Sequence, residues 1–155
     1  MLHQRELSGF LFSTDPGLID FDAVHTFLTT SYWSPGISRA LVERAIANSI
    51  PFGVYERSQP HPDPHRQVGF ARIVTDRATF AYMADVFITQ PFRRRGLSKL
   101  LMHFIFDHPD LQGRRRICLM TRDAQGLYER YGFTYLDDPR RFMELVNRNT
   151  ASGTP

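Results

Sequence analysis

The stretch from Asp85 to His108 constrains the fold of this chain more than any other part of the sequence. Residues 85–89 have the apolar character of a strand, and a turn that contains three arginines and Gly96 follows them. Apolar side chains then recur at the spacing of one helical face, at Leu97, Leu100, Leu101, Phe104, Ile105 and His108. The chain therefore passes from a strand through a tight turn into an amphipathic helix, as in a mixed sheet covered by helices.

The same turn predicts an anion site. Free backbone N–H groups at a helix N-terminus point at one spot, and the helix dipole makes that spot favourable for phosphate. Gly96 allows a ligand to approach the backbone closely. Such a concave nest suits a pyrophosphate better than a long polyanion.

The distribution of charge also indicates an anionic ligand. Residues 1–90 hold 7 basic and 9 acidic side chains, whereas residues 91–155 hold 12 basic and 7 acidic ones. This excess is compatible with a nucleic acid, an anionic lipid surface or a phosphorylated small molecule. The arginines at 93–95 and the only lysine, Lys99, lie close to Gly96. That clustering favours the phosphorylated small molecule, since no interleaving of aromatic and basic residues typical of single-strand binding is found.

Periodicity and turn signals predict the remaining elements. Asp20 or Asp22 caps a first helix that runs toward Tyr32, and Ser38 caps a second helix that ends before Pro51. The later helices are 96–108, and one from the cap Asp123 to Tyr131 that Gly132 terminates. The predicted strands are 6–12, 51–57, 67–76, 80–89, 116–120, 133–136 and 142–146.

This order of elements predicts the α/β class, with one mixed, mostly antiparallel sheet flanked by helices. A length of 155 residues and 42% hydrophobic side chains suit one domain with a buried core. We expect a single domain at 1–146 and a flexible, polar tail at 147–155.

Two motifs of the sequence lie in separate parts of this predicted domain. Arg93, Gly96 and Ser98 follow the pattern Arg or Gln, two residues, Gly, one residue, Gly or Ala. A second segment has the pattern Ala-x-x-Leu-Tyr-x-x-x-Gly-Phe, at Ala124, Leu127, Tyr128, Gly132 and Phe133. Both motifs, at this separation, closely resemble the GNAT superfamily of acetyl-CoA-dependent N-acetyltransferases. The resemblance implies the GNAT-like acyl-CoA N-acyltransferase fold, with acetyl-CoA as the acetyl-donor cosubstrate and no metal.

The resemblance also implies roles for individual residues. The backbone of Val86, Phe87 and Ile88 would pair with the pantetheine arm, and Tyr128 would be the general acid. The residues implied to bind the cofactor are Val86, Phe87, Ile88, Arg93, Arg94, Arg95, Gly96, Leu97, Ser98, Lys99 and Thr121. Within this set, Arg94 through Lys99 would cradle the pyrophosphate.

Two positions depart from the family pattern. Ser98 stands where Gly or Ala is usual, so its hydroxyl either adds a hydrogen bond to phosphate or its extra atoms loosen the cofactor. Thr121 stands where many members have an asparagine that contacts the cofactor.

Acetyl transfer to an amine needs a deprotonated amine, stabilisation of the oxyanion and protonation of the thiolate. A backbone N–H near Ile88 can meet the thioester carbonyl if a bulge frees it from the strand ladder, as in the family. Asp85 is the acidic candidate for the base, acting through a water, and the alternative is a structural carboxylate paired with an arginine. Tyr32 and Trp33 are candidates for the wall of the amine pocket, and the alternative for Trp33 is a place in the core.

Other conspicuous residues have structural explanations. His61 and His65 lie in a proline-rich loop without helical spacing or nearby cysteines, so we expect no zinc site. Cys118, the only cysteine, is expected to be a small buried hydrophobe. The triplet at 114–116 is expected to be a solvated turn.

The functional hypothesis is an N-acetyltransferase that transfers the acetyl group of acetyl-CoA to a primary amine of a small molecule or peptide, by direct attack in a ternary complex. The alternative is a GNAT-like protein that binds acyl-CoA without turnover, in a regulatory or sensing role. Neither needs a nucleic acid or a membrane. No apolar run approaches the ~20 residues of a membrane span, and the first ten residues lack a signal-peptide core. We therefore expect a cytoplasmic protein. Either a monomer or a homodimer is compatible with the sequence.

Overall fold

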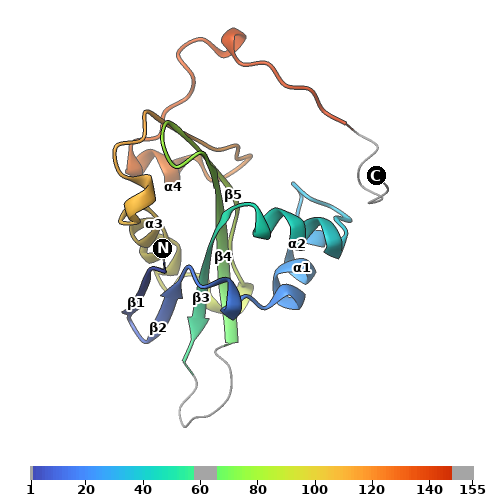
Figure 1. Cartoon of the computed structure of the whole chain (residues 1–155), viewed down its shortest axis with the longest axis vertical. Helices are drawn as coiled ribbons and strands as arrows, with labels where there is room; N and C mark the ends of the chain where they lie inside the picture. Colours follow the sequence, from blue (N-terminus) through green and yellow to red (C-terminus); the bar gives the residue numbers. More distant parts are fainter. Residues whose placement is uncertain (1, 58–65, 148–155) are drawn as a thin grey trace.

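Figure 1 shows the computed structural model, which describes residues 2–57 and 66–147. Its centre is a six-stranded sheet in the order β1-β2-β3-β4-β5-β6. The strands are β1 (Gln4–Leu7), β2 (Phe10–Ser13), β3 (Ile50–Glu56), β4 (Arg66–Thr75), β5 (Phe80–Ile88) and β6 (Arg116–Cys118). All neighbouring strands are antiparallel except β5 and β6, which are parallel. The predicted mixed, mostly antiparallel sheet is confirmed.

Helices cover both faces of this sheet (Figure 1). On one face lie α1 (Phe21–Thr29) and α2 (Arg39–Ala47), and on the other lie α3 (Leu97–Phe106) and α4 (Gln125–Tyr128). The Asp20 carboxylate accepts from the Ala23 N–H at 2.9 Å, and the Ser38 hydroxyl accepts from the Leu41 N–H at 3.3 Å. Both predicted caps are therefore confirmed.

The two faces carry separate apolar clusters. The larger one joins α3 to the strands through aromatic side chains such as Phe52 and Phe104, whose ring centres are 5.9 Å apart. The smaller cluster packs α1 and α2 onto Phe70 and Phe87. Phe27 of α1 stacks on Phe87 at 3.8 Å, so the helix pair is anchored directly on β5.

The N-terminal strand is shorter than expected. Residues 6–12 were predicted as one strand, but the chain forms a hairpin of β1 and β2. Ser8 and Gly9 make the turn, with φ of 52° and 79°. The left-handed conformation at these two positions reverses the chain in the middle of the apolar run.

The C-terminal part departs most from the prediction. The segments 133–136 and 142–146 are not strands, and of the predicted strand 116–120 only Arg116–Cys118 is paired. A short 3-10 helix, η5 (Pro139–Arg141), lies between the two segments. Figure 1 shows the chain arching away from the sheet along this stretch.

The helix that carries the second motif is also shorter than predicted. It consists of α4 and the following 3-10 helix η4 (Glu129–Tyr131), and Gly132 ends it with φ of 85° as predicted. Asp123 is not its cap, which corrects the prediction: the N-cap residue is Ala124, and no side chain caps the helix. Thr121 Oγ1 accepts from the Ala124 N–H at 3.0 Å in the turn before it. Within residues 2–57 and 66–147, no helix has both the length and the apolar character needed to cross a bilayer.

His108 is a buried polar group beneath the sheet. Its side chain is 1% exposed, and its Nδ1 accepts from the Asp110 N–H at 3.2 Å. The ring centres of Phe52 and His3 each lie 5.5 Å away. Burial lowers the pKa of His108 below its ordinary value of 6.5, so the folded protein holds this imidazole neutral.

We therefore expect the free energy of unfolding to fall as the pH drops below about 6.5. The unfolded chain takes up the proton at that pH, whereas folded His108 does so only at a lower pH, and acid consequently favours unfolding. His108→Asn keeps a capping acceptor and removes the titration. Urea unfolding at pH 7.5 and pH 5 should show a smaller loss for the variant than for the wild type. Equal losses in the two proteins would contradict this explanation.

Candidate functional site

The strand β5 contains one extra residue beside Asp85. Phe70 of β4 lies opposite Phe87, and Arg72 lies opposite Ala84, so two steps along β4 correspond to three along β5. Asp85 has a φ of 56°, the left-handed conformation of a bulged residue. A bulge is therefore present in β5, but it lies three residues before Ile88, which is itself in register with Gly69 of β4.

Beyond the bulge, one edge of β5 is open. β6 pairs with β5 only at residues Phe80 to Tyr82. From Met83 to Ile88, the part of the chain that the structure describes supplies no strand on that side. An extended ligand can add to such an edge as a further strand, through hydrogen bonds to its backbone. The predicted pantetheine positions, Val86 to Ile88, lie on this edge.

The carboxylate of Asp85 is held between two side chains. Arg72 Nε donates to its Oδ2 at 2.5 Å, and Trp33 Nε1 donates to its Oδ1 at 3.1 Å. The side chain of Asp85 is only 9% exposed. Asp85 is thus paired with an arginine, as the structural alternative predicted, and this arginine is Arg72 of the neighbouring strand.

The turn after α1 joins this pair to the segment after β6. Tyr32 and Trp33 pack edge to face at 5.0 Å. The Tyr32 hydroxyl accepts from the Arg122 N–H at 3.0 Å, and the guanidinium of Arg122 lies 3.8 Å from the centre of the Tyr32 ring. The structure therefore brings the two predicted acceptor-side aromatics together with Asp85, and their side chains remain about 40% exposed.

The arginine turn between β5 and α3 is shaped for an anion. Arg94 and Gly96 have φ of 64° and 76°, and Gly96 is the residue from which α3 begins. No described atom accepts a hydrogen bond from the backbone N–H groups of residues 94–98. A Cβ placed on Gly96 would meet no protein atom within 4 Å, so the space in front of the turn is open. Convergent N–H groups of this kind bind phosphate.

The side chains of the arginine turn differ in their contacts and exposure. Arg93 Nε donates to the Ile88 carbonyl at 3.0 Å, which ties the turn to the end of β5. The guanidinium of Arg95 lies 4.9 Å from the centre of the Phe92 ring, while Arg94 and Lys99 are exposed. Leu97 is buried in the core, so only its backbone can serve a ligand. Ser98 is half-buried at the first turn of α3.

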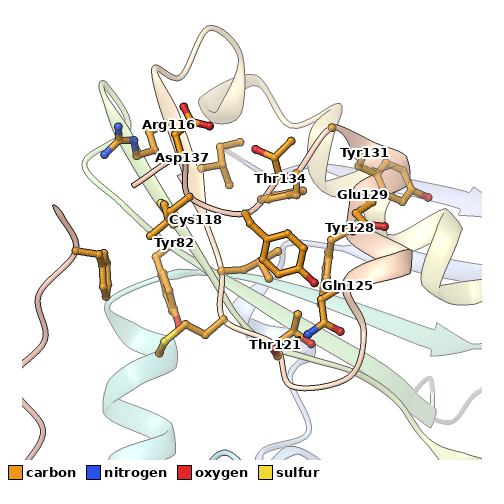
Figure 2. A pocket seen from close by; sticks show the side chains of 18 of the residues that line it. Tyr82, Arg116, Cys118, Thr121, Gln125, Tyr128, Glu129, Tyr131, Thr134 and Asp137 are labelled. Atoms are coloured by element: carbon orange, nitrogen blue, oxygen red, sulfur yellow. Dashed lines mark hydrogen bonds between the residues drawn. The ribbon is translucent and has the colours of Figure 1, made fainter. Parts of the chain in front are cut away.

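Tyr128 lies in α4 and lines a groove of about 940 Å³ beside β6. Figure 2 shows Tyr82 and Cys118 on one side of this groove, and Gln125 and Tyr128 on the other. Tyr128 is 8% exposed, and burial together with the nearby Tyr32 hydroxyl raises its pKa to about 12. This phenol is therefore protonated near neutral pH, and the raised pKa makes it a weaker acid than a free tyrosine side chain.

The remaining residues singled out in the sequence are Thr121, Cys118, His61 and His65. Thr121 lines the groove, but its hydroxyl caps the turn at Ala124. Cys118 is half-buried and lines the groove, which corrects the expectation that it is a buried hydrophobe. His61 and His65 fall outside the described residues. Among the residues that the structure does describe, no group of three or more His, Cys, Asp or Glu side chains could hold a metal ion.

Sequence reasoning missed Arg72 and Arg122. Arg72 interrupts the apolar strand Gln67 to Val74, and a charge in such a strand signals a partner on the next strand. Arg122 gave no comparable signal, because its contact with Tyr32 joins residues 90 positions apart.

Comparison with known proteins agrees with the motifs. The model of the acetyltransferase (GNAT) domain matches residues 51–135. A protein of Gibberella zeae, named as a candidate acetyltransferase, is 28% identical over 135 residues, which cover 77% of this chain and 75% of that protein.

Solved structures show the same fold. A crystal structure of a GNAT-family protein from Xanthomonas campestris is 43% identical, with a TM-score of 0.84, over 95% of this chain and 99% of that one. A candidate acetyltransferase from Deinococcus radiodurans shares the fold at 19% identity, with a TM-score of 0.69, over 98% of both chains. The matched domain covers both motifs, the bulged strand and the arginine turn, and the chain belongs to the GNAT acetyltransferase family.

Proposed function

We propose that this protein transfers the acetyl group of acetyl-CoA to a primary amine of a small molecule or peptide, within a ternary complex. The observation that carries the proposal is the continuity between the open edge of β5 and the arginine turn. An open strand edge and a nest of free N–H groups lie only a few residues apart along the chain, at Val86–Ile88 and at residues 94–98. Coenzyme A has an extended, amide-containing arm that ends in a pyrophosphate, so its two chemical parts match these two features.

The residues of the turn fit a pyrophosphate. The backbone N–H groups of residues 94–98 bind its oxygens, and the exposed side chains of Arg94 and Lys99 supply positive charge. Arg93 keeps the turn fixed through its bond to the Ile88 carbonyl. The open space in front of Gly96 admits the ligand, because no side chain fills it.

Acetyl-CoA supplies the acetyl group as a thioester, and the chain supplies the groups that assist its transfer. A backbone N–H of the bulged segment after Asp85 stabilises the developing oxyanion. Tyr128, which is protonated near neutral pH, donates a proton to the departing sulfur.

Asp85 receives the proton of the incoming amine, through a water. Its two oxygens are already bound, by Arg72 and by Trp33. The water that delivers the proton therefore takes the place of Trp33 Nε1 at Oδ1, while Arg72 continues to bind Oδ2. Because Trp33 and Tyr32 are partly exposed, the amine reaches Asp85 from the side of the turn after α1.

The cofactor site is tested with Gly96→Ala. Its new Cβ enters the space where the pyrophosphate binds, and we expect the affinity for acetyl-CoA to fall about tenfold or more, measured by calorimetry. Gly113→Ala is the matched control. Gly113 also has a positive φ, of 68°, and open space around its Cβ, but it follows the opposite end of α3. Equal affinities in the two variants would contradict the assignment.

The reaction is tested by thiol release from acetyl-CoA in the presence of a panel of primary amines. We expect release with at least one amine, and Tyr128→Phe should lower kcat about 100-fold while leaving the acetyl-CoA Kd within about twofold. Tyr131→Phe is the control, because the Tyr131 hydroxyl instead donates to the Lys99 carbonyl at 3.3 Å.

Tight binding of acetyl-CoA without turnover on any amine would favour the alternative function, an acyl-CoA-binding protein with a regulatory role. Full activity of Tyr128→Phe would show that Tyr128 is not the general acid, without contradicting the proposed reaction.

A further inference from the structure

The sheet face that carries α1 and α2 is only partly covered by these helices. Arg72 of β4 lies opposite Ala84 of β5, and Val74 lies opposite Tyr82, so these four side chains share one face of the sheet. Phe70, two residues before Arg72, is on the same face and is packed under the helices. Val74 is 40% exposed, and Tyr82 is half-buried. The helices therefore cover this face at Phe70 and leave it exposed at Val74.

Exposed apolar and aromatic side chains connect this open part of the sheet to the surroundings of Asp85. The Tyr82 phenol lies beside the backbone of Met120, whose side chain is 69% exposed. Burial and the Asp85 carboxylate both raise the pKa of Tyr82, so the phenol is close enough to the proposed base to interact with it. Trp33 contacts Asp85 directly, and it packs against Tyr32. We call the exposed surface of the following side chains the aromatic face: Tyr32, Trp33, Val74, Tyr82 and Met120.

The charged side chains that contact the aromatic face are already paired with one another. Arg72 donates to Asp85, and Arg122, whose guanidinium lies over the Tyr32 ring, is 3.7 Å from Asp123. These two carboxylates and two guanidinium groups have no net charge. A ligand with several cationic groups would therefore meet no surplus carboxylate among them, and a ligand carboxylate would meet no unpaired cation.

We propose that the acceptor is a primary amine joined by a short aliphatic chain to an aromatic ring, and that its ring binds on the aromatic face. This inference rests on the proposed function, in which Asp85 receives the proton of the amine. The ring packs against the aromatic side chains of the face, and the amine lies next to Asp85. Polyamines, amino acids and basic peptides fit less well, because each adds a charge that finds no partner there.

The transfer to such an amine balances with the groups already described. The N–C bond of the amide forms as the C–S bond of the thioester breaks. The amine proton passes through a water to Asp85, and Tyr128 protonates the sulfur. The aromatic ring takes no part in these steps, so it affects binding and position only.

Fluorescence of Trp33 tests the acceptor class without requiring turnover, since Trp33 is the only tryptophan of the chain. The protein, saturated with free coenzyme A, is titrated with phenethylamine, butylamine, phenylalanine and spermidine. We expect the Kd of phenethylamine to be at least about tenfold lower than the other three. Butylamine lacks the ring, phenylalanine adds a carboxylate, and spermidine adds cations. Equal Kd values for phenethylamine and butylamine, tighter binding of phenylalanine or spermidine, or no response to phenethylamine would overturn the proposal.

Val74→Glu tests the charge argument at one position of the aromatic face. The new carboxylate should raise the Kd of phenethylamine about tenfold and lower that of spermidine about threefold. A variant that failed to fold would lose both ligands, so opposite shifts identify a change of specificity. Leu2→Glu is the control, because Leu2 is also exposed but precedes β1, and it should alter neither Kd. An unchanged preference in Val74→Glu would contradict the assignment of the face.

Thiol release from acetyl-CoA with the same four amines separates this inference from the proposed function. We expect phenethylamine to have the highest kcat/KM of the four. A higher kcat/KM for spermidine or phenylalanine would support acetyl transfer but overturn the acceptor class. Phenethylamine that binds tightly and is never acetylated would contradict the proposed function, while its binding would still support the aromatic face as a site for aromatic amines.

Discussion

The extra residue in β5 at Asp85 is the feature on which the rest of the site depends. An unbroken ladder would use the backbone groups of β5 within the sheet, whereas the bulge displaces the strand just where its pairing with β6 has already ended. The left-handed conformation of Asp85 carries a cost for a residue with a side chain. The ion pair with Arg72 joins the bulge to the adjacent strand in a largely buried position.

This arrangement separates binding from chemistry. Backbone groups, at the open edge of β5 and at the start of α3, form the proposed surface for acetyl-CoA. The groups proposed to take part in the reaction are side chains from distant parts of the chain: Asp85, which Trp33 contacts, and Tyr128 in the groove beside β6. Changes in the turn after α1 can therefore alter the acceptor without altering the cofactor site, as expected when functional side chains lie on loops over a rigid sheet.

Local signals in the sequence predicted a large part of the fold. The caps at Asp20 and Ser38, the apolar face of the helix after Gly96, and the end of the last helix at Gly132 all depend on a few neighbouring residues, and the structure confirms them. The hairpin turn at Ser8 and Gly9 was missed, because the apolar residues around it continue the pattern of one strand.

Long-range partners were harder to predict. The pairing of Arg72 with Asp85 requires the register of β4 and β5, and the contact of Arg122 with Tyr32 requires the tertiary fold. The strand pattern at 142–146 gave a strand prediction, yet the structure leaves this segment unpaired. An apolar sequence pattern indicates that a segment suits a sheet, but it does not specify the strand with which the segment pairs.

A crystal structure with acetyl-CoA bound tests the proposed function most directly. We predict that the amides of the pantetheine arm bond to the backbone of Val86–Ile88, that the pyrophosphate accepts from the N–H groups of residues 94–98, and that the thioester lies between Asp85 and Tyr128. Acetyl-CoA bound elsewhere on the chain, or a thioester remote from Tyr128, would contradict the proposed function.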